Sequence, residues 1–200
     1  MQDRPKLTIL FLAADPSNAA RLRLGQELRD IQDELDRAKE RERFSLQSKL
    51  SARSGDINRA LLDYSPHIIH FSGHGRQTGE ICFEDAVGEV HPIEPDALAT
   101  AFSLVTDTVQ CVVLNACYTE PQAEAISEHI PFVIGMGSSI GDKAAIAFAV
   151  GFYKTLGAKY DGTTCDIEYA YKFGCAEIGL TQRSGAKEHL TPILYQKKKF

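Results

Sequence analysis

Short apolar runs separated by helical patterns are the feature that most constrains the fold of this chain. The runs lie at residues 6–14, 68–71, 110–115 and 132–136, and each is bounded by glycine, proline or polar residues. Runs of this length without polar alternation are typical of strands buried on both faces, as in a parallel sheet. Because helical patterns lie between them, the sequence predicts an α/β fold. We expect a three-layer sandwich in which helices flank a mostly parallel central sheet.

The other expected elements complete this pattern. Apolar residues at three- and four-residue steps predict a long amphipathic helix that ends near Arg43, with Ser17 or Asn18 as its N-cap. Gly157 is expected to close an alanine-rich helix. The remaining predictions are helices at 56–64, 95–105, 122–129, 142–156 and 166–178, strands at 44–50 and 192–195, and a β-hairpin within 80–93.

Composition narrows the class of protein. The 200 residues are expected to form a single domain, residues 1–200, and 44% of them are hydrophobic. A net charge of −5 argues against nucleic acid as a direct partner. The longest apolar stretch, residues 144–153, is shorter than the roughly 20 residues of a membrane span, so no membrane association is expected. The five cysteines are an odd number without framework or zinc spacing, which favours free thiols in a cytoplasmic protein and argues against a structural zinc site. No metal and no other cofactor is expected.

Two of the predicted strands end at a reactive side chain. One leads into HFSGHG at residues 70–75, and the other into VLNAC at residues 113–117. Because parallel strands place their carboxyl ends at one edge of a sheet, we expect His74 and Cys117 to meet there. An imidazole beside a thiol takes its proton and leaves a nucleophilic thiolate. Taken singly, His74 would fit a turn histidine and Cys117 a buried core cysteine.

Together these motifs resemble the CHAT family, caspase-like peptidases grouped with separase, gingipain and the metacaspases. The similarity runs from residues 7–13 to residues 144–153 and so covers most of the chain. The resemblance implies a caspase-like cysteine endopeptidase with Cys117 as nucleophile and His74 as general base and acid. It makes the amides of Gly75 and Cys117 the oxyanion donors. It further implies protein substrates, an activating protein partner and a role in a bacterial stress or antiphage response.

The same resemblance predicts a substrate pocket. It makes the loop that carries Ser138 and Ser139 a wall of this pocket, and it places Asp15 and Asp142 at strand ends that help to form it. Caspases bind aspartate there with arginine, and no arginine is expected at these positions of the chain. We therefore predict cleavage after Arg or Lys. Locally, Asp15 also fits a turn former and Asp142 a helix N-cap.

Two segments that flank the expected cleft are predicted to control activation. Segments 80–93 and 118–122 contain few large apolar side chains, so we expect them to be mobile and to occlude or misalign the resting site.

Three other interpretations are possible from the sequence. In the first, the chain is a catalytically silent caspase-like interaction module. In the second, it is a nucleotide-binding α/β protein that uses the glycine-rich loop 135–141. A zinc site at His67, His70 and His74 is weaker, because side chains alternate along a strand. His70 is expected to be buried and to support the catalytic loop through hydrogen bonds.

Overall fold

The computed structural model describes residues 6–160, 165–182 and 186–197. Its central sheet has six strands in the order β2-β1-β3-β7-β8-β9, all parallel except β9. This arrangement confirms the predicted mostly parallel α/β sandwich. The strands are β1 (Leu7–Ala13), β2 (Phe44–Lys49), β3 (Ile68–Ser72), β7 (Cys111–Asn115), β8 (Phe132–Met136) and β9 (Pro192–Gln196).

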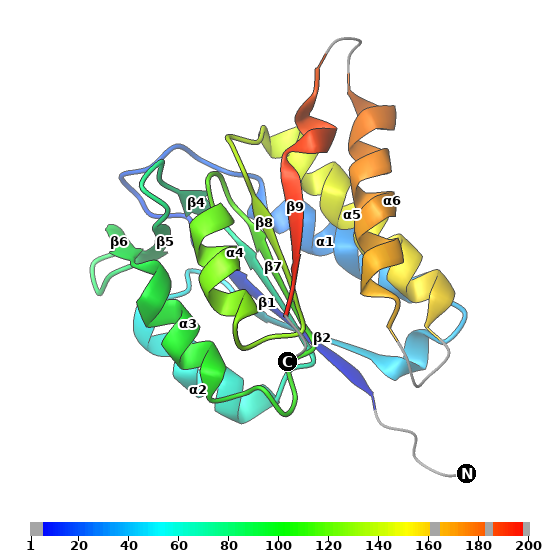
Figure 1. Cartoon of the computed structure of the whole chain (residues 1–200), viewed down its shortest axis with the longest axis horizontal. Coiled ribbons are helices and arrows are strands. Elements are labelled where there is room, and N and C mark those ends of the chain that lie inside the picture. The colour runs from blue at the N-terminus through cyan, green and yellow to red at the C-terminus, as the bar shows by residue number, and fades with distance from the viewer. Residues whose placement is uncertain (1–5, 161–164, 183–185, 198–200) are drawn as a thin grey trace.

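Helices cover both faces of the sheet (Figure 1). Consecutive strand residues divide between the two sides: Phe11 packs in the core beneath α1, α5 and α6, whereas Leu10 packs in the core beneath α2, α3 and α4. This double burial explains why the strands are apolar throughout. None of the described helices combines the length and apolar character of a membrane span. The helices are α1 (Leu24–Asp36), α2 (Ser54–Tyr64), α3 (Pro95–Ser103), α4 (Glu120–Ser127), α5 (Asp142–Lys159) and α6 (Ile167–Thr181).

A second, three-stranded antiparallel sheet lies beside the carboxyl ends of the central strands. It consists of β4 (His74–Gly75), β5 (Ile81–Glu84) and β6 (Val90–Ile93). The predicted hairpin is present as β5 and β6, but β4 was not expected. Few large apolar anchors are expected here, but Ile81 and Phe83 are fully buried at 0% and 1% exposure. In the segment 118–122, Thr119 and Gln122 are also fully buried. The expected mobility of segments 80–93 and 118–122 stays a prediction.

Two predictions about helix ends are wrong in an informative way, and the other helices lie within three residues of their predicted bounds. Helix α1 begins at Leu24, well after Ser17, and ends at Asp36, followed by the short 3-10 helix η1 (Arg41–Arg43). Residues 39–43 offer no apolar side chain to bury, so tertiary packing does not support a longer helix. Helix α5 continues through Gly157, where a Cβ would stand 3.0 Å from that of Ala38. Gly157 therefore permits close helix packing and does not end the helix.

Candidate active site

The two predicted catalytic motifs leave adjacent strands at the same edge. Ser72 and Asn115, the last residues of β3 and β7, are register partners. His74 and Cys117 each follow two residues later. The backbones of the two loops touch, since a Cβ built on Gly75 would stand 1.8 Å from the carbonyl oxygen of Cys117. The structure therefore brings the two motifs together as the sheet topology requires.

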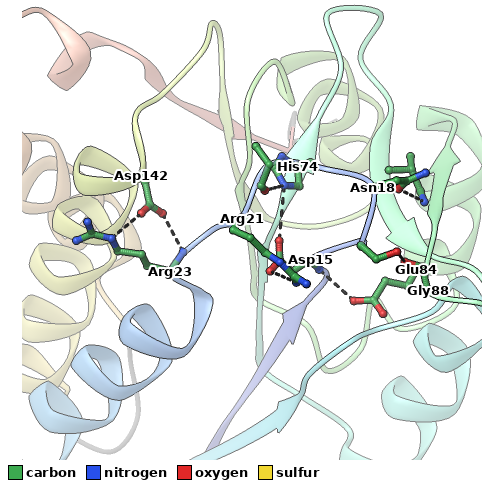
Figure 2. A network of polar contacts seen from close by, with 11 residues as sticks. Asp15, Asn18, Arg21, Arg23, His74, Glu84, Gly88 and Asp142 are labelled. Atoms are coloured by element: carbon green, nitrogen blue, oxygen red, sulfur yellow. Dashed lines mark hydrogen bonds and ion pairs between the residues drawn. The ribbon is translucent and has the colours of Figure 1, made fainter.

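The imidazole of His74 is held by the backbone of the segment before α1. Its Nε2 lies 2.7 Å from the carbonyl oxygen of Ala20 and 3.9 Å from Oδ1 of Asp15 (Figure 2). A carbonyl only accepts, so Nε2 carries the proton and donates it to Ala20. In the neutral ring, Nδ1 is then the atom with a free lone pair, which suits it to act as a base.

The thiol of Cys117 is half-buried and lies against Ile140. The amide of Ile140 donates to Sγ at 3.4 Å, and Sγ lies 3.6 Å from the carbonyl oxygen of Ile140. Among the contacts of the described residues, no hydrogen bond joins Sγ to His74. The next residue, Tyr118, has a left-handed backbone (φ 56°), a strain that costs about 1–3 kcal/mol outside glycine. Its N–H donates to the carbonyl oxygen of Ser138 at 3.2 Å and so ties the cysteine loop to the glycine-rich loop.

Gly75 offers one of the two predicted oxyanion donors. The N–H of Arg76 donates to the carbonyl of Glu80 at 3.0 Å, so Arg76 and Glu80 form a hydrogen-bonded pair of the hairpin. The adjacent pair, Gly75 and Ile81, is then a non-hydrogen-bonded pair. The N–H of Gly75 consequently points away from β5 and is not used by this ladder.

Both predicted specificity carboxylates form ion pairs with arginines. Nη1 of Arg21 lies 3.0 Å from Oδ2 of Asp15, and Nε of Arg23 lies 3.5 Å from Oδ2 of Asp142 (Figure 2). The expectation that no arginine lies here is therefore wrong. It failed because both arginines precede α1 in sequence and reach the site only through the tertiary fold. Asp142 is also not the N-cap of α5, a position that Gly141 holds. Asp142 instead accepts the backbone N–H of Arg23 at 3.3 Å.

The segment that carries Ala20 is fastened to the β5–β6 hairpin (Figure 2). The backbone N–H of Asp15 donates to Glu84 at 3.1 Å, that of Ser17 to the carbonyl of Gly88 at 2.8 Å, and that of Val90 to Oδ1 of Asn18 at 3.0 Å. Ser17 and Asn18 thus anchor this segment and do not cap α1. Sequence reasoning missed Ala20, because a backbone carbonyl carries no residue-specific signal.

The glycine-rich loop at residues 135–141 is not arranged as a phosphate cradle. The N–H of Gly137 donates to the carbonyl of Thr191 at 2.9 Å, and that of Gly141 to the carboxylate of Glu188 at 2.6 Å. A carboxylate beside the loop repels phosphate, so the geometry disfavours nucleotide binding. Ser138 and Ser139 are exposed on this loop and directly precede Ile140, which contacts Cys117.

The three histidines of the zinc hypothesis have separate partners, and His67 lies at the opposite end of β3 from the site. Nδ1 of His67 accepts the backbone N–H of Thr8 at 3.0 Å, His70 is buried beside Glu27, and His74 contacts Ala20. Within the described residues, no group of three His, Cys, Asp or Glu side chains is placed to hold a metal ion. The zinc interpretation therefore finds no support in the geometry.

Comparisons with known proteins agree with the geometry of the site. No protein-family model matches the chain. It is 26% identical over 165 residues to a probable protease of Gillisia limnaea, covering 82% of this chain and 29% of that protein. It is 25% identical over 178 residues to a Roc-COR-CHAT protease of Runella zeae, covering 88% of this chain and 18% of the relative. The chain thus spans less than a third of the curated relatives it matches.

Solved structures show the same architecture. Caspase-1 from Spodoptera frugiperda superposes with a TM-score of 0.61 at 13% identity, covering 97% of this chain and 86% of that one. A secreted C11 cysteine protease from Bacteroides thetaiotaomicron gives a TM-score of 0.60 at 12% identity, covering 86% and 59%. The chain therefore has a caspase-like fold. Two of its sequence relatives are named Roc-COR-CHAT protease, in agreement with the resemblance that the two motifs carry.

Proposed function

We propose that this chain is a cysteine endopeptidase domain in which Cys117 and His74 form the catalytic dyad. The backbone contact between Gly75 and Cys117 is the observation that carries this proposal, because it joins the two motifs at one sheet edge. The names of the sequence relatives and the caspase-like fold support the same activity.

The mechanism follows from the donors and acceptors at this edge. Nδ1 of His74 takes the thiol proton, and the sulfur of Cys117 attacks the scissile carbonyl carbon. The amides of Gly75 and Cys117 stabilise the resulting oxyanion, and such a donor contributes about 3 kcal/mol. His74 then protonates the leaving amine, which departs and leaves an acyl-enzyme. Water, deprotonated by His74, releases the acyl group and regenerates the thiol.

The contacts of Cys117 with Ile140 suggest how the resting site is controlled. We propose that Sγ leaves the backbone of Ile140 and turns towards His74 when the site becomes active. A protein partner that shifts loop 137–141 would drive this change. The relatives named Roc-COR-CHAT protease are several times longer than the matched segment, which supports control by other protein parts. We place such control in a cytoplasmic bacterial stress or antiphage response.

Asp15 supports the proposed preference for Arg or Lys before the cut. Its Oδ1 has no hydrogen-bond partner among the described residues and lies 3.9 Å from Nε2 of His74. This oxygen is buried in the resting site, so a movement of Arg21 would have to open it to a basic side chain. Arg21 contacts only Oδ2 and is itself 74% exposed, which leaves it free to move when substrate binds. Asp142 is the lesser contributor in this proposal.

Profiling against a fluorogenic peptide library tests the activity. Cys117→Ala should reduce cleavage to background, and His74→Ala should lower kcat/KM by about 10²–10⁴-fold. Cys175→Ala serves as the matched control, because Cys175 lies on α6. Full activity in Cys117→Ala would refute the dyad. A folded wild-type protein that cleaves nothing, even with candidate partners, would favour the silent interaction module.

A further inference from the structure

A buried carboxylate lies directly beneath the proposed site. Glu27, on α1, is only 2% exposed. Its Oε1 lies 2.8 Å from Nε2 of His70 and 2.6 Å from Nδ2 of Asn115, and its Oε2 lies 2.5 Å from Oγ of Ser72. No Lys or Arg side chain contacts this carboxylate among the described residues. Such a burial costs several kcal/mol unless hydrogen bonds replace the lost water.

The protons of the cluster can be assigned from its chemistry. Burial raises the pKa of Tyr153 well above its usual value, so its phenol stays protonated. The hydroxyl of Tyr153 lies 3.2 Å from Nδ1 of His70 and donates to it, which leaves Nε2 of His70 as the donor to Glu27. Ser72 donates its hydroxyl and Asn115 its amide. Three donors therefore meet one carboxylate and replace the water that it loses on burial.

The position of these donors matters more than their number. Ser72 ends β3 and Asn115 ends β7, and the two are register partners. Only Gly73 separates Ser72 from His74, and only Ala116 separates Asn115 from Cys117. One carboxylate thus joins the two strand ends at the point where both proposed catalytic loops begin.

We propose that Glu27 is a positioning residue for the dyad, a role that rests on the proposed peptidase function. By holding Ser72 and Asn115 on its two oxygens, it fixes the separation and register of the loops that carry His74 and Cys117. The segment before α1 adds the carbonyl of Ala20, which orients the imidazole of His74. Helix α1 and the segment before it therefore position both members of the dyad, through the carboxylate of Glu27 and the carbonyl of Ala20.

Activity measurements on three variants test this role. Glu27→Ala leaves His70 and Ser72 without this acceptor and Asn115 with only the carbonyl of Ala145. It should lower kcat by about 10²-fold with little change in KM, because misplacement of reacting groups has costs of this size. Glu27→Gln should recover most of the loss, since its carbonyl oxygen accepts from two donors and the Ser72 hydroxyl can rotate to accept from its amide. Ile31→Ala is the control, because Ile31 is 0% exposed on the same helix but packs in the apolar core. It should lower the melting temperature while folded protein keeps its kcat.

Backbone amide chemical shifts supply a readout that does not need activity. In Glu27→Ala, amides 73–75 and 116–118 should move together, whereas Ile31→Ala should leave them in place and Glu27→Gln should move them little. If Glu27→Ala fails to fold, Ser72→Ala, which removes one donor, should still shift residues 73–75. Unmoved loops in Glu27→Ala, or equal effects from Ile31→Ala, would overturn the positioning role. Wild-type protein as inactive as Cys117→Ala would count against the peptidase alone, because the shifts still decide the role of Glu27.

Discussion

The α-carbon of Gly75 packs against the carbonyl oxygen of Cys117, with no room between them for a side chain. Gly73, two residues earlier, is similarly confined, since a Cβ there would stand 2.8 Å from the carbonyl oxygen of Ala14. The HFSGHG motif therefore needs its glycines because backbones approach closely, and neither glycine has a positive φ. The distance between the two proposed catalytic loops is set by backbone contact.

Gly75→Ala should consequently separate the loops. A Cβ 1.8 Å from a backbone oxygen forces the main chain to move, and overpacking of this kind typically costs about 1–3 kcal/mol. We expect a lower melting temperature and a loss of peptidase activity larger than the stability change explains. Gly25→Ala is the control, because a Cβ on Gly25 meets nothing within 4 Å and alanine favours the helix. Normal turnover by folded Gly75→Ala would show that this contact does not align the site.

Much of the fold could be predicted from the sequence because both sides of the strands are buried. Ile9 and Leu10 face opposite cores, so the strands read as unbroken apolar runs. The segment before α1 could not be predicted, since its contacts with Glu84 and Gly88 come from residues about 70 positions away. Local pattern instead suggested a helix cap at Ser17.

Glu27 was missed although a signal for it exists. Its position between Leu24 and Ile31 lies on the apolar stripe of α1, where a charged residue is unusual. A carboxylate on a buried stripe needs buried donors, and these lie on strands distant in sequence. The sequence could therefore mark the residue as unusual but could not supply its partners.

Cys117 should react with iodoacetamide faster than the other cysteines near neutral pH. Burial raises the pKa of Cys82, Cys111 and Cys175 and keeps their thiols protonated, and Cys111 is also 0% exposed. Mass spectrometry of timed samples should show one early adduct at Cys117, absent in Cys117→Ala and slower in His74→Ala. Equal rates at Cys117 and Cys175 would indicate an inactive module.

The pairing of Asp15 with Arg21 gives a test of substrate preference. Asp15→Ala should lower kcat/KM for peptides with Arg or Lys before the cut far more than for neutral peptides. Arg21→Ala should raise kcat/KM for these basic peptides relative to neutral ones, since it leaves the carboxylate of Asp15 without its arginine partner. The ratio of the two efficiencies is the useful measure, because Asp15 also lies 3.9 Å from His74 and its loss affects every substrate. A library profile dominated by cuts after Asp or apolar residues would refute this pocket.

Stability should also depend on pH through His67, which links the start of β3 to β1. Nδ1 of His67 accepts the backbone N–H of Thr8, and burial lowers the pKa of this imidazole from 6.5. Between the lowered pKa and 6.5, the unfolded chain binds more protons than the folded one, so the free energy of unfolding rises with pH. We therefore expect His67 to reduce stability as pH falls below 6.5 and to have no such effect above it. Urea unfolding at pH 7.5 and 5.5 should show a smaller pH difference in His67→Gln, whose side-chain oxygen can still accept from Thr8 but does not titrate. An unchanged pH difference in that variant would mean that other groups control the acid sensitivity of the fold.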